Sequence, residues 1–167
     1  MILYILSWSV SLFFILIKGN LINHLLFRFL DVDLVVVIIA YLMVYYGETG
    51  TGIFAFGQGI LIDIFSGGIL GLFTLLYLII FFSIKLGSRP LYLLSAGGQI
   101  IIVLLAVLLK EILIISFSYL FSLEIVFSFS DILMFASSAI FSGLIAPIIF
   151  YFFNQTNRFL IEVSLES

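Results

Sequence analysis

The ten residues from Ile100 to Leu109 read IIIVLLAVLL, a run without a single polar side chain. Strands of a transmembrane β-barrel are segments of about ten residues in which apolar and polar side chains alternate, so this run excludes a barrel. Inside a lipid bilayer its backbone amides must be satisfied within an α-helix. The stretch therefore predicts a membrane-spanning helix, which we expect to cover residues 96–121.

The composition extends this prediction to the whole chain of 167 residues. Hydrophobic residues make up 65% of it and charged residues only 9%, whereas a soluble domain carries roughly 25% charged residues. So little charge excludes a soluble enzyme, and the six Lys and Arg residues form no cluster that could bind a nucleic acid. The absence of cysteine excludes disulfides and thiolate metal sites. We therefore expect an all-α polytopic membrane protein.

Six apolar blocks, separated by polar or glycine-rich breaks, predict about six transmembrane helices in one compact bundle, a single domain over 1–167. The blocks cover residues 2–17, 34–46, 53–65, 69–84, 96–121 and 132–153. Residues 18–33 combine an apolar stripe with a polar face, which is typical of an amphipathic helix at the membrane interface or of a lead-in to the second span. The second and third blocks have about 13 residues, or roughly 20 Å of helix, against an apolar core of about 30 Å. A re-entrant hairpin of these two blocks, in a five-span arrangement, is therefore an alternative.

Local signals mark where the helices end or bend. The segment Gly47-Glu48-Thr49-Gly50-Thr51-Gly52 has three glycines in six residues, which predicts a tight connection instead of a helix. Pro147 predicts a kink in the sixth span. A short polar tail is expected from Asn154 onward.

The basic residues predict the orientation in the membrane. Six spans place both termini on one side. That side would carry Lys85, Arg89 and Arg158, and the opposite side Lys18 and Arg28. Because positive charge is enriched on the cytoplasmic side, this excess favours both termini in the cytoplasm.

Three ionisable residues fall inside predicted spans, where each costs at least a few kcal/mol unless it has a partner. The first, Asp63 in the third block, lies one turn before the break Ser66-Gly67-Gly68. Its carboxylate can accept hydrogen bonds from the first amides of the next helix, which have no partner within that helix. The alternative is a functional carboxylate that carries a proton or a cation in a transporter.

Lys110 and Glu111 are the other two, in the middle of the fifth span. Adjacent helical residues point about 100° apart, so the two side chains are not expected to face one partner. One hypothesis pairs Lys110 with Asp63 and leaves Glu111 to a hydroxyl group or a partner protein. The other is that Lys110 extends toward the membrane surface and Glu111 is protonated in a wet crevice.

The sequence offers no constellation for catalysis or metal binding. His24 is the single histidine, so no second histidine stands at ligand spacing. The motifs that surround a nucleophilic serine are missing, and the carboxylates are too dispersed for an acid–base pair. We therefore expect a protein that is not an enzyme and that uses neither a metal nor another cofactor.

From Gly59 to Gly71 the chain reads GILIDIFSGGILG, which has the form G-x-x-x-D-x-x-S-G-x-x-L-G. This motif resembles the most recognisable part of the MreD family, the small bacterial membrane proteins that determine rod shape. The resemblance covers residues 31–84 by motif and the remainder by hydropathy alone. The motif maps onto Gly59, Asp63, Ser66, Gly67 and Gly71. The chain departs from the family at Val32-Asp33, where members often carry Pro-Asp or Pro-Asn, and in the extra charge of Lys110-Glu111.

The resemblance implies a non-enzymatic scaffold subunit of the cell-elongation (rod) complex in the bacterial cytoplasmic (inner) membrane. Such a subunit binds MreC and, through it, is linked to cytoplasmic MreB filaments. It supports peptidoglycan synthesis by a SEDS-family glycosyltransferase and its transpeptidase partner, and thereby cell shape. The motif residues are then a helix-break element that shapes the fold, and membrane lipids are the remaining expected partners.

A second hypothesis is a substrate-binding S-component of an energy-coupling-factor vitamin transporter. These subunits are also small, apolar and built of six helices, and an MreD-like chain could share their architecture. They commonly carry an A-x-x-x-A contact motif in the first helix, where this chain has Ser7 and Ser11. Retention of a small vitamin through purification would distinguish this hypothesis from the scaffold.

Overall fold

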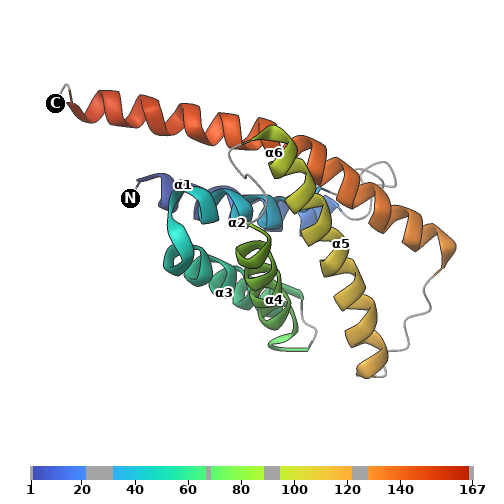
Figure 1. The fold of residues 1–167 in the computed structure, drawn as a ribbon. Coiled ribbons are helices and arrows are strands. Elements are labelled where there is room, and N and C mark those ends of the chain that lie inside the picture. Colours follow the sequence, from blue (N-terminus) through green and yellow to red (C-terminus); the bar gives the residue numbers. More distant parts are fainter. Residues whose placement is uncertain (1, 22–31, 67–68, 89–94, 122–127, 166–167) are drawn as a thin grey trace.

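The computed structural model describes residues 2–21, 32–66, 69–88, 95–121 and 128–165. Within these ranges the chain forms six α-helices and no strand, which confirms the all-α fold class. The helices are α1 (Ile2–Leu21), α2 (Leu34–Tyr45), α3 (Gly47–Ser66), α4 (Leu72–Gly87), α5 (Ala96–Leu120) and α6 (Phe129–Leu165). They pack into one bundle with α2 in its interior (Figure 1).

The α2 helix is the centre of the hydrophobic core. Every residue from Val35 to Leu42 is buried, so this part of the helix is covered on all sides. A helix in that position needs apolar residues all round, and this stretch holds only aliphatic and aromatic side chains. Because α2 contacts each of the other helices, it is the element around which they assemble.

Within the described ranges, two helices are long and apolar enough to cross a membrane. One is α5, Ala96–Leu120, with a mean hydropathy of 2.8, and the other is the part of α6 from Ser130 to Asn157, with 2.1. About 20 apolar residues are needed to cross the hydrocarbon core. By length and composition, these two helices suggest association with a membrane.

The predicted tight connection over residues 47–52 is wrong for most of that segment. The α3 helix already begins at Gly47, so the turn from α2 is made by that residue, whose φ is +72°. Each glycine inside a helix costs about 1 kcal/mol relative to alanine, and two hydrogen bonds to this segment help to offset this cost. The Tyr4 hydroxyl donates to the carbonyl oxygen of Gly50 at 3.0 Å, and the Thr51 hydroxyl donates to that of Gly47 at 2.7 Å.

Other boundaries differ at the ends of helices. The α1 helix continues to Leu21, beyond the predicted end at residue 17, and α4 begins at Leu72 instead of residue 69. Most of the predicted amphipathic segment, residues 22–31 with His24, lies outside the described residues. Asp33, at the end of this segment, is described. It caps α2 by accepting a hydrogen bond from the Val36 amide at 3.2 Å.

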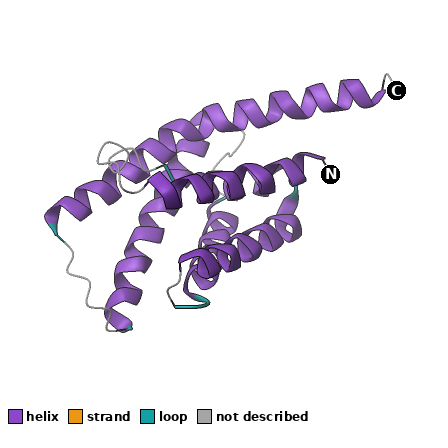
Figure 2. Cartoon of the chain, turned by 180° about the vertical axis from the view of Figure 1, so that it is seen from behind, coloured by secondary structure: helices purple, strands orange, loops and turns teal. Residues whose placement is uncertain are grey.

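The α6 helix extends to Leu165, so the polar tail predicted from Asn154 continues the helix instead of following it. Its last part projects beyond the other helices in both views (Figures 1 and 2). The helix changes direction partway along its length, and Pro147 lies inside it (Figure 1). A proline removes one backbone hydrogen bond and clashes with the preceding turn, which accounts for such a bend.

Candidate functional site

The carboxylate of Asp63 caps the N-terminus of α4. Its Oδ1 accepts from the Phe73 amide at 2.8 Å, and its Oδ2 accepts from the Gly71 amide at 3.0 Å. The Thr74 amide and hydroxyl also donate to Oδ2, at 3.1 and 2.6 Å. These are first-turn amides without partners inside α4, at the positive end of its dipole. The capping interpretation of Asp63 is therefore confirmed.

Two glycines of the motif make this cap possible. Gly59 lies one turn before Asp63 on the same side of α3, and a Cβ there would overlap the Thr74 backbone. Gly71 takes up φ +93° immediately before α4, a conformation that strains any other residue. The absent side chain at Gly59 lets α4 approach closely enough for its amides to reach the carboxylate. The motif is thus a structural element at the α3–α4 turn.

The remaining motif residues differ in what the structure shows. Ser66 ends α3, and its hydroxyl donates to the backbone carbonyl of Asp63 at 3.3 Å. Gly67 lies outside the described residues.

The predicted pairing of Lys110 with Asp63 is wrong. Lys110 forms an ion pair with Asp33, and its Nζ also lies 3.0 Å from Oε1 of Glu111. The physical reason is that donors at the start of α4 surround the carboxylate of Asp63. Lys110 and Glu111 also contact one another, although they are adjacent in the helix. Their long side chains bridge the angle between the two positions.

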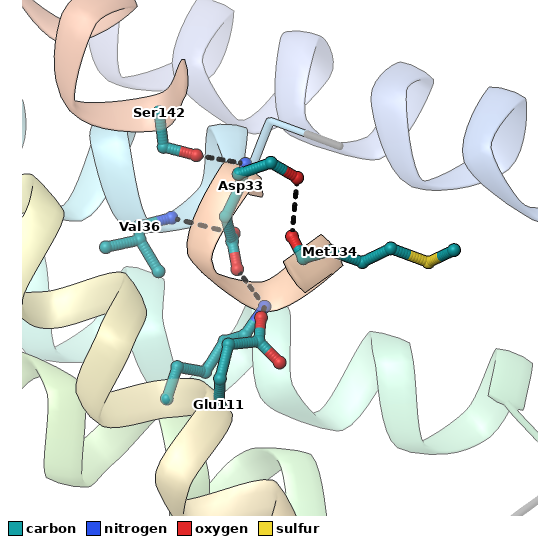
Figure 3. A network of polar contacts seen from close by, with 7 residues as sticks. Asp33, Val36, Glu111, Met134 and Ser142 are labelled. Carbon is teal, nitrogen blue, oxygen red and sulfur yellow. Dashed lines mark hydrogen bonds and ion pairs between the residues drawn. The ribbon is translucent and has the colours of Figure 1, made fainter. Parts of the chain in front are cut away.

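Asp33 is the residue of the candidate site that the sequence interpretation missed. Its backbone amide donates to the Ser142 hydroxyl at 2.8 Å, which joins α2 to α6 (Figure 3). Figure 3 shows Asp33 at the centre of the contacts, with Ser142 and Val36 to its left and Glu111 below it. An aspartate immediately before an apolar helix is a typical N-cap, and that signal could have identified it.

Asp33, Lys110 and Glu111 are removed from solvent, with side chains exposed by 5%, 10% and 9%. Burying charges costs several kcal/mol per ion, and a pair survives there only with good geometry and further hydrogen bonds. Their contacts link the start of α2 to α5 through the ion pair and to α6 through the hydrogen bond with Ser142. We call these three residues the ionic network.

The ionic network forms one wall of a cavity of about 490 Å³. All six helices contribute to its lining, at the end of the bundle where α1 and α3 end and α2, α4 and α6 begin. Phe65, Ser66 and Phe73 at the ends of α3 and α4 also line it, so the helix-break motif and the ionic network border the same space. Asp131 and Ser138 of α6 add further polar groups.

The volume of the cavity is typical of a small-molecule site. Small-molecule sites occupy roughly 300–1,000 Å³ and combine apolar walls with a few convergent polar groups. Among the described residues, no three His, Cys, Asp or Glu side chains are placed to hold a metal ion. The fold and the site together define a helical bundle with a buried ionic network beside a partly enclosed cavity.

Comparison with known proteins adds no relative. No model of a protein family matches the chain, and neither does any curated protein or solved structure. The resemblance to MreD therefore depends on the motif and on the hydropathy pattern of the sequence.

Proposed function

We propose that this chain is a multi-pass membrane scaffold of the MreD type, a non-enzymatic subunit that binds an MreC-type protein in the bacterial inner membrane. Through MreC it would act with MreB filaments, the SEDS glycosyltransferase and its transpeptidase in peptidoglycan synthesis and cell-shape control. The observation that carries the proposal is the α3–α4 turn. The one costly residue of the motif, Asp63, is engaged by α4 donors, so the motif shapes a helix pair and holds no reactive group.

The surface of the bundle supports a position inside the bilayer. Each of the six helices exposes large apolar side chains, among them Ile5, Tyr45, Ile64, Phe82, Ile112 and Ile148. A protein surrounded by water rarely exposes extended apolar patches on all sides. Lipid tails are the solvent that such a surface fits, and helix contacts with the span of a partner can form on it.

The described helix ends support six crossings over a re-entrant hairpin. Tyr4 at the start of α1 bonds to Gly50 at the start of α3, and Glu48 pairs with Lys85 at the end of α4, with 2.6 Å between Oε2 and Nζ. The turn between α2 and α3 therefore lies level with the start of α1 and the end of α4. A hairpin that turns back at the middle of the membrane would not reach that level.

Co-purification tests the proposal. The tagged chain is isolated in mild detergent from membranes of a rod-shaped bacterium with intact cell-wall machinery, beside an unrelated tagged membrane protein of similar size. We expect an MreC-type protein to be recovered with the chain and not with the control. Recovery of an ATPase with its coupling membrane subunit, and no MreC-type protein, would contradict the scaffold.

The cavity favours a second candidate, the S-component of an energy-coupling-factor vitamin transporter. Its volume of about 490 Å³ and its buried polar wall are what a small-molecule site requires. This candidate predicts that a vitamin stays bound through purification and is released on denaturation. Mass spectrometry of the released fraction distinguishes the two functions, because a scaffold retains no vitamin.

A further inference from the structure

We propose that the cavity beside the ionic network binds a phospholipid of the bilayer, which places one acyl chain inside the cavity. This lipid site goes beyond the scaffold function, so it stands or falls independently of whether MreC is the partner. It depends on the apolar part of the lining and on the position of the opening, and not on the charge of the ionic network.

Most of the cavity lining is apolar. Ten of the sixteen described lining residues are aliphatic, aromatic or methionine, among them Phe14, Ile62, Phe73, Ile114 and Phe135. Such walls offer water few hydrogen-bonding partners, whereas a hydrocarbon chain makes dispersion contacts with all of them. The lining therefore favours an acyl chain over a strongly hydrated ligand.

The cavity opens beside the end of α3. Phe65 and Ser66 line the cavity and are also exposed, Phe65 by 57%. In the turn that follows, Leu70 is 76% exposed, and no charged residue occurs from Ile64 to Phe73. Exposed apolar side chains without charge are typical of a surface that lipid covers. A ligand that enters beside Phe65 therefore comes from the bilayer.

The length of α4 brings lipid head groups close to this opening. The helix has 16 residues, or about 24 Å, against a hydrocarbon core of about 30 Å. A bilayer thins beside a span that is shorter than its core. The head groups next to α4 are therefore drawn toward the α3–α4 turn. The ester groups and the first part of an acyl chain then lie level with the cavity, where its polar lining residues orient them.

Photolabelling of the full chain in nanodiscs tests the site. The probe is a phosphatidylcholine that carries a diazirine near the end of one acyl chain, and mass spectrometry of peptides locates the modified residues. Tyr77 and Glu111 line the cavity and are only 5% and 7% exposed, so lipid on the outer surface does not reach them. We expect at least one of them to be modified, together with the exposed Tyr151, which surface lipid contacts. Modification confined to exposed residues would overturn the proposal.

Two neighbouring substitutions on α6 show whether the labelled chain lies in the cavity. Met134→Trp adds bulk to a side chain that lines the cavity, whereas Leu133→Trp adds it to a side chain that is 53% exposed and outside the lining. We expect the modification of Tyr77 and Glu111 to fall at least about tenfold in Met134→Trp, because the added ring overfills the space. Leu133→Trp is the matched control and leaves it unchanged. Labelling at the native level in Met134→Trp would place the chain elsewhere and contradict the proposal.

A second pair on α5 covers the case in which Met134→Trp does not fold. Ile114 lines the cavity, whereas Ile112 is 58% exposed and lies outside the lining. We expect Ile114→Trp to reduce the modification of Tyr77 and Glu111, and Ile112→Trp to leave it unchanged. Circular dichroism checks that both variants remain helical. Equal labelling of the two α5 variants would show that the chain does not occupy the cavity.

Analysis of the purified protein identifies the natural occupant. The full chain is purified from bacterial membranes in mild detergent and denatured, and mass spectrometry identifies the released molecules, beside Leu133→Trp and Met134→Trp prepared in the same way. We expect a stoichiometric phospholipid from the native chain and from Leu133→Trp, and less from Met134→Trp. A water-soluble molecule released at that stoichiometry would overturn the lipid assignment, whatever the result of the MreC co-purification.

Discussion

Thr74 donates two hydrogen bonds to Oδ2 of Asp63, from its amide at 3.1 Å and from its hydroxyl at 2.6 Å. Asp63 is 3% exposed, so water does not compete effectively for this oxygen. The α3–α4 pair is therefore held by a carboxylate whose donors, among the described residues, all come from the start of the following helix. The consequences of removing its charge follow directly from this geometry.

We expect Asp63→Asn to fold with reduced stability. The amide of asparagine places a donor where the Gly71 and Thr74 amides also donate, and the favourable interaction with the α4 dipole is lost. Unsatisfied buried donors cost about 1–3 kcal/mol. Thermal unfolding in detergent, followed by circular dichroism, measures the loss. Glu48→Gln, an exposed carboxylate in an ion pair, is the control, and an Asp63→Asn variant as stable as this control would contradict the capping role.

Gly59→Ala tests the close approach of α3 and α4. The added methyl group overlaps the backbone of Thr74, so one helix must shift and the Asp63 cap must loosen. Overpacking of this kind costs about 1–3 kcal/mol. Gly97→Ala is the matched control, because a Cβ there meets nothing within 4 Å and alanine favours the helix. Equal stability of the two variants would show that α4 does not approach Gly59 as described.

Lys110→Met tests the ionic network. The methionine fills similar space but leaves the carboxylates of Asp33 and Glu111 buried without their cation, which costs about 3–5 kcal/mol. We expect Asp33→Asn in the same chain to restore part of the stability, because the asparagine keeps an oxygen for the Val36 amide. The double-mutant cycle gives the coupling energy. Additive losses from the two changes would show that the residues do not interact.

A charge swap provides the matching negative control. Asp63→Lys combined with Lys110→Asp is expected to give no more folded protein than either single change, because these residues bind different partners. Recovery of folded yield in the swapped chain would contradict the assignment of Lys110 to Asp33. Size-exclusion chromatography of a fluorescent fusion measures the yield.

The features that the sequence predicts well are local ones. The Asp63 cap connects residues about one helical turn on either side of a glycine-rich break, so spacing and helix-end chemistry are sufficient to infer it. The apolar blocks likewise locate the helices, since backbone groups in lipid must pair within each segment. The glycine-rich start of α3 is the exception, because contacts from Tyr4 outweigh the low helix propensity of that segment.

The ionic network could not be inferred in the same way. Asp33 and Lys110 are 77 residues apart, and their pairing depends on how α2 and α5 pack in three dimensions. Periodicity gives the face of a residue within its own helix but not the neighbour of that face. Asp33 also ends a polar segment, so nothing in its local pattern indicates burial. The cavity is lined by all six helices, so it too could not be predicted without knowing how the helices pack.

Cysteine labelling decides between six crossings and a re-entrant hairpin of α2 and α3. The chain contains no cysteine, so single substitutions report one position each. With cytoplasmic termini and six crossings, Leu70→Cys faces the outside and Glu48→Cys faces the cytoplasm. We therefore expect a membrane-impermeant maleimide to label Leu70→Cys in spheroplasts and to label Glu48→Cys only after the membrane is opened.

Lys85→Cys is the control for that experiment, because Glu48 and Lys85 form an ion pair and must lie at one level. Both positions have to become reactive together when the membrane is opened. A hairpin predicts instead that Glu48→Cys, at the tip and inside the bilayer, stays unreactive while Lys85→Cys is labelled. The inverse pattern, with Glu48→Cys and Lys85→Cys labelled in spheroplasts and Leu70→Cys protected, would reverse the orientation. Because Glu48 and Lys85 are paired, α2 and α3 must cross the membrane if α4 does. Maleimide labelling of the two cysteine variants tests both crossings.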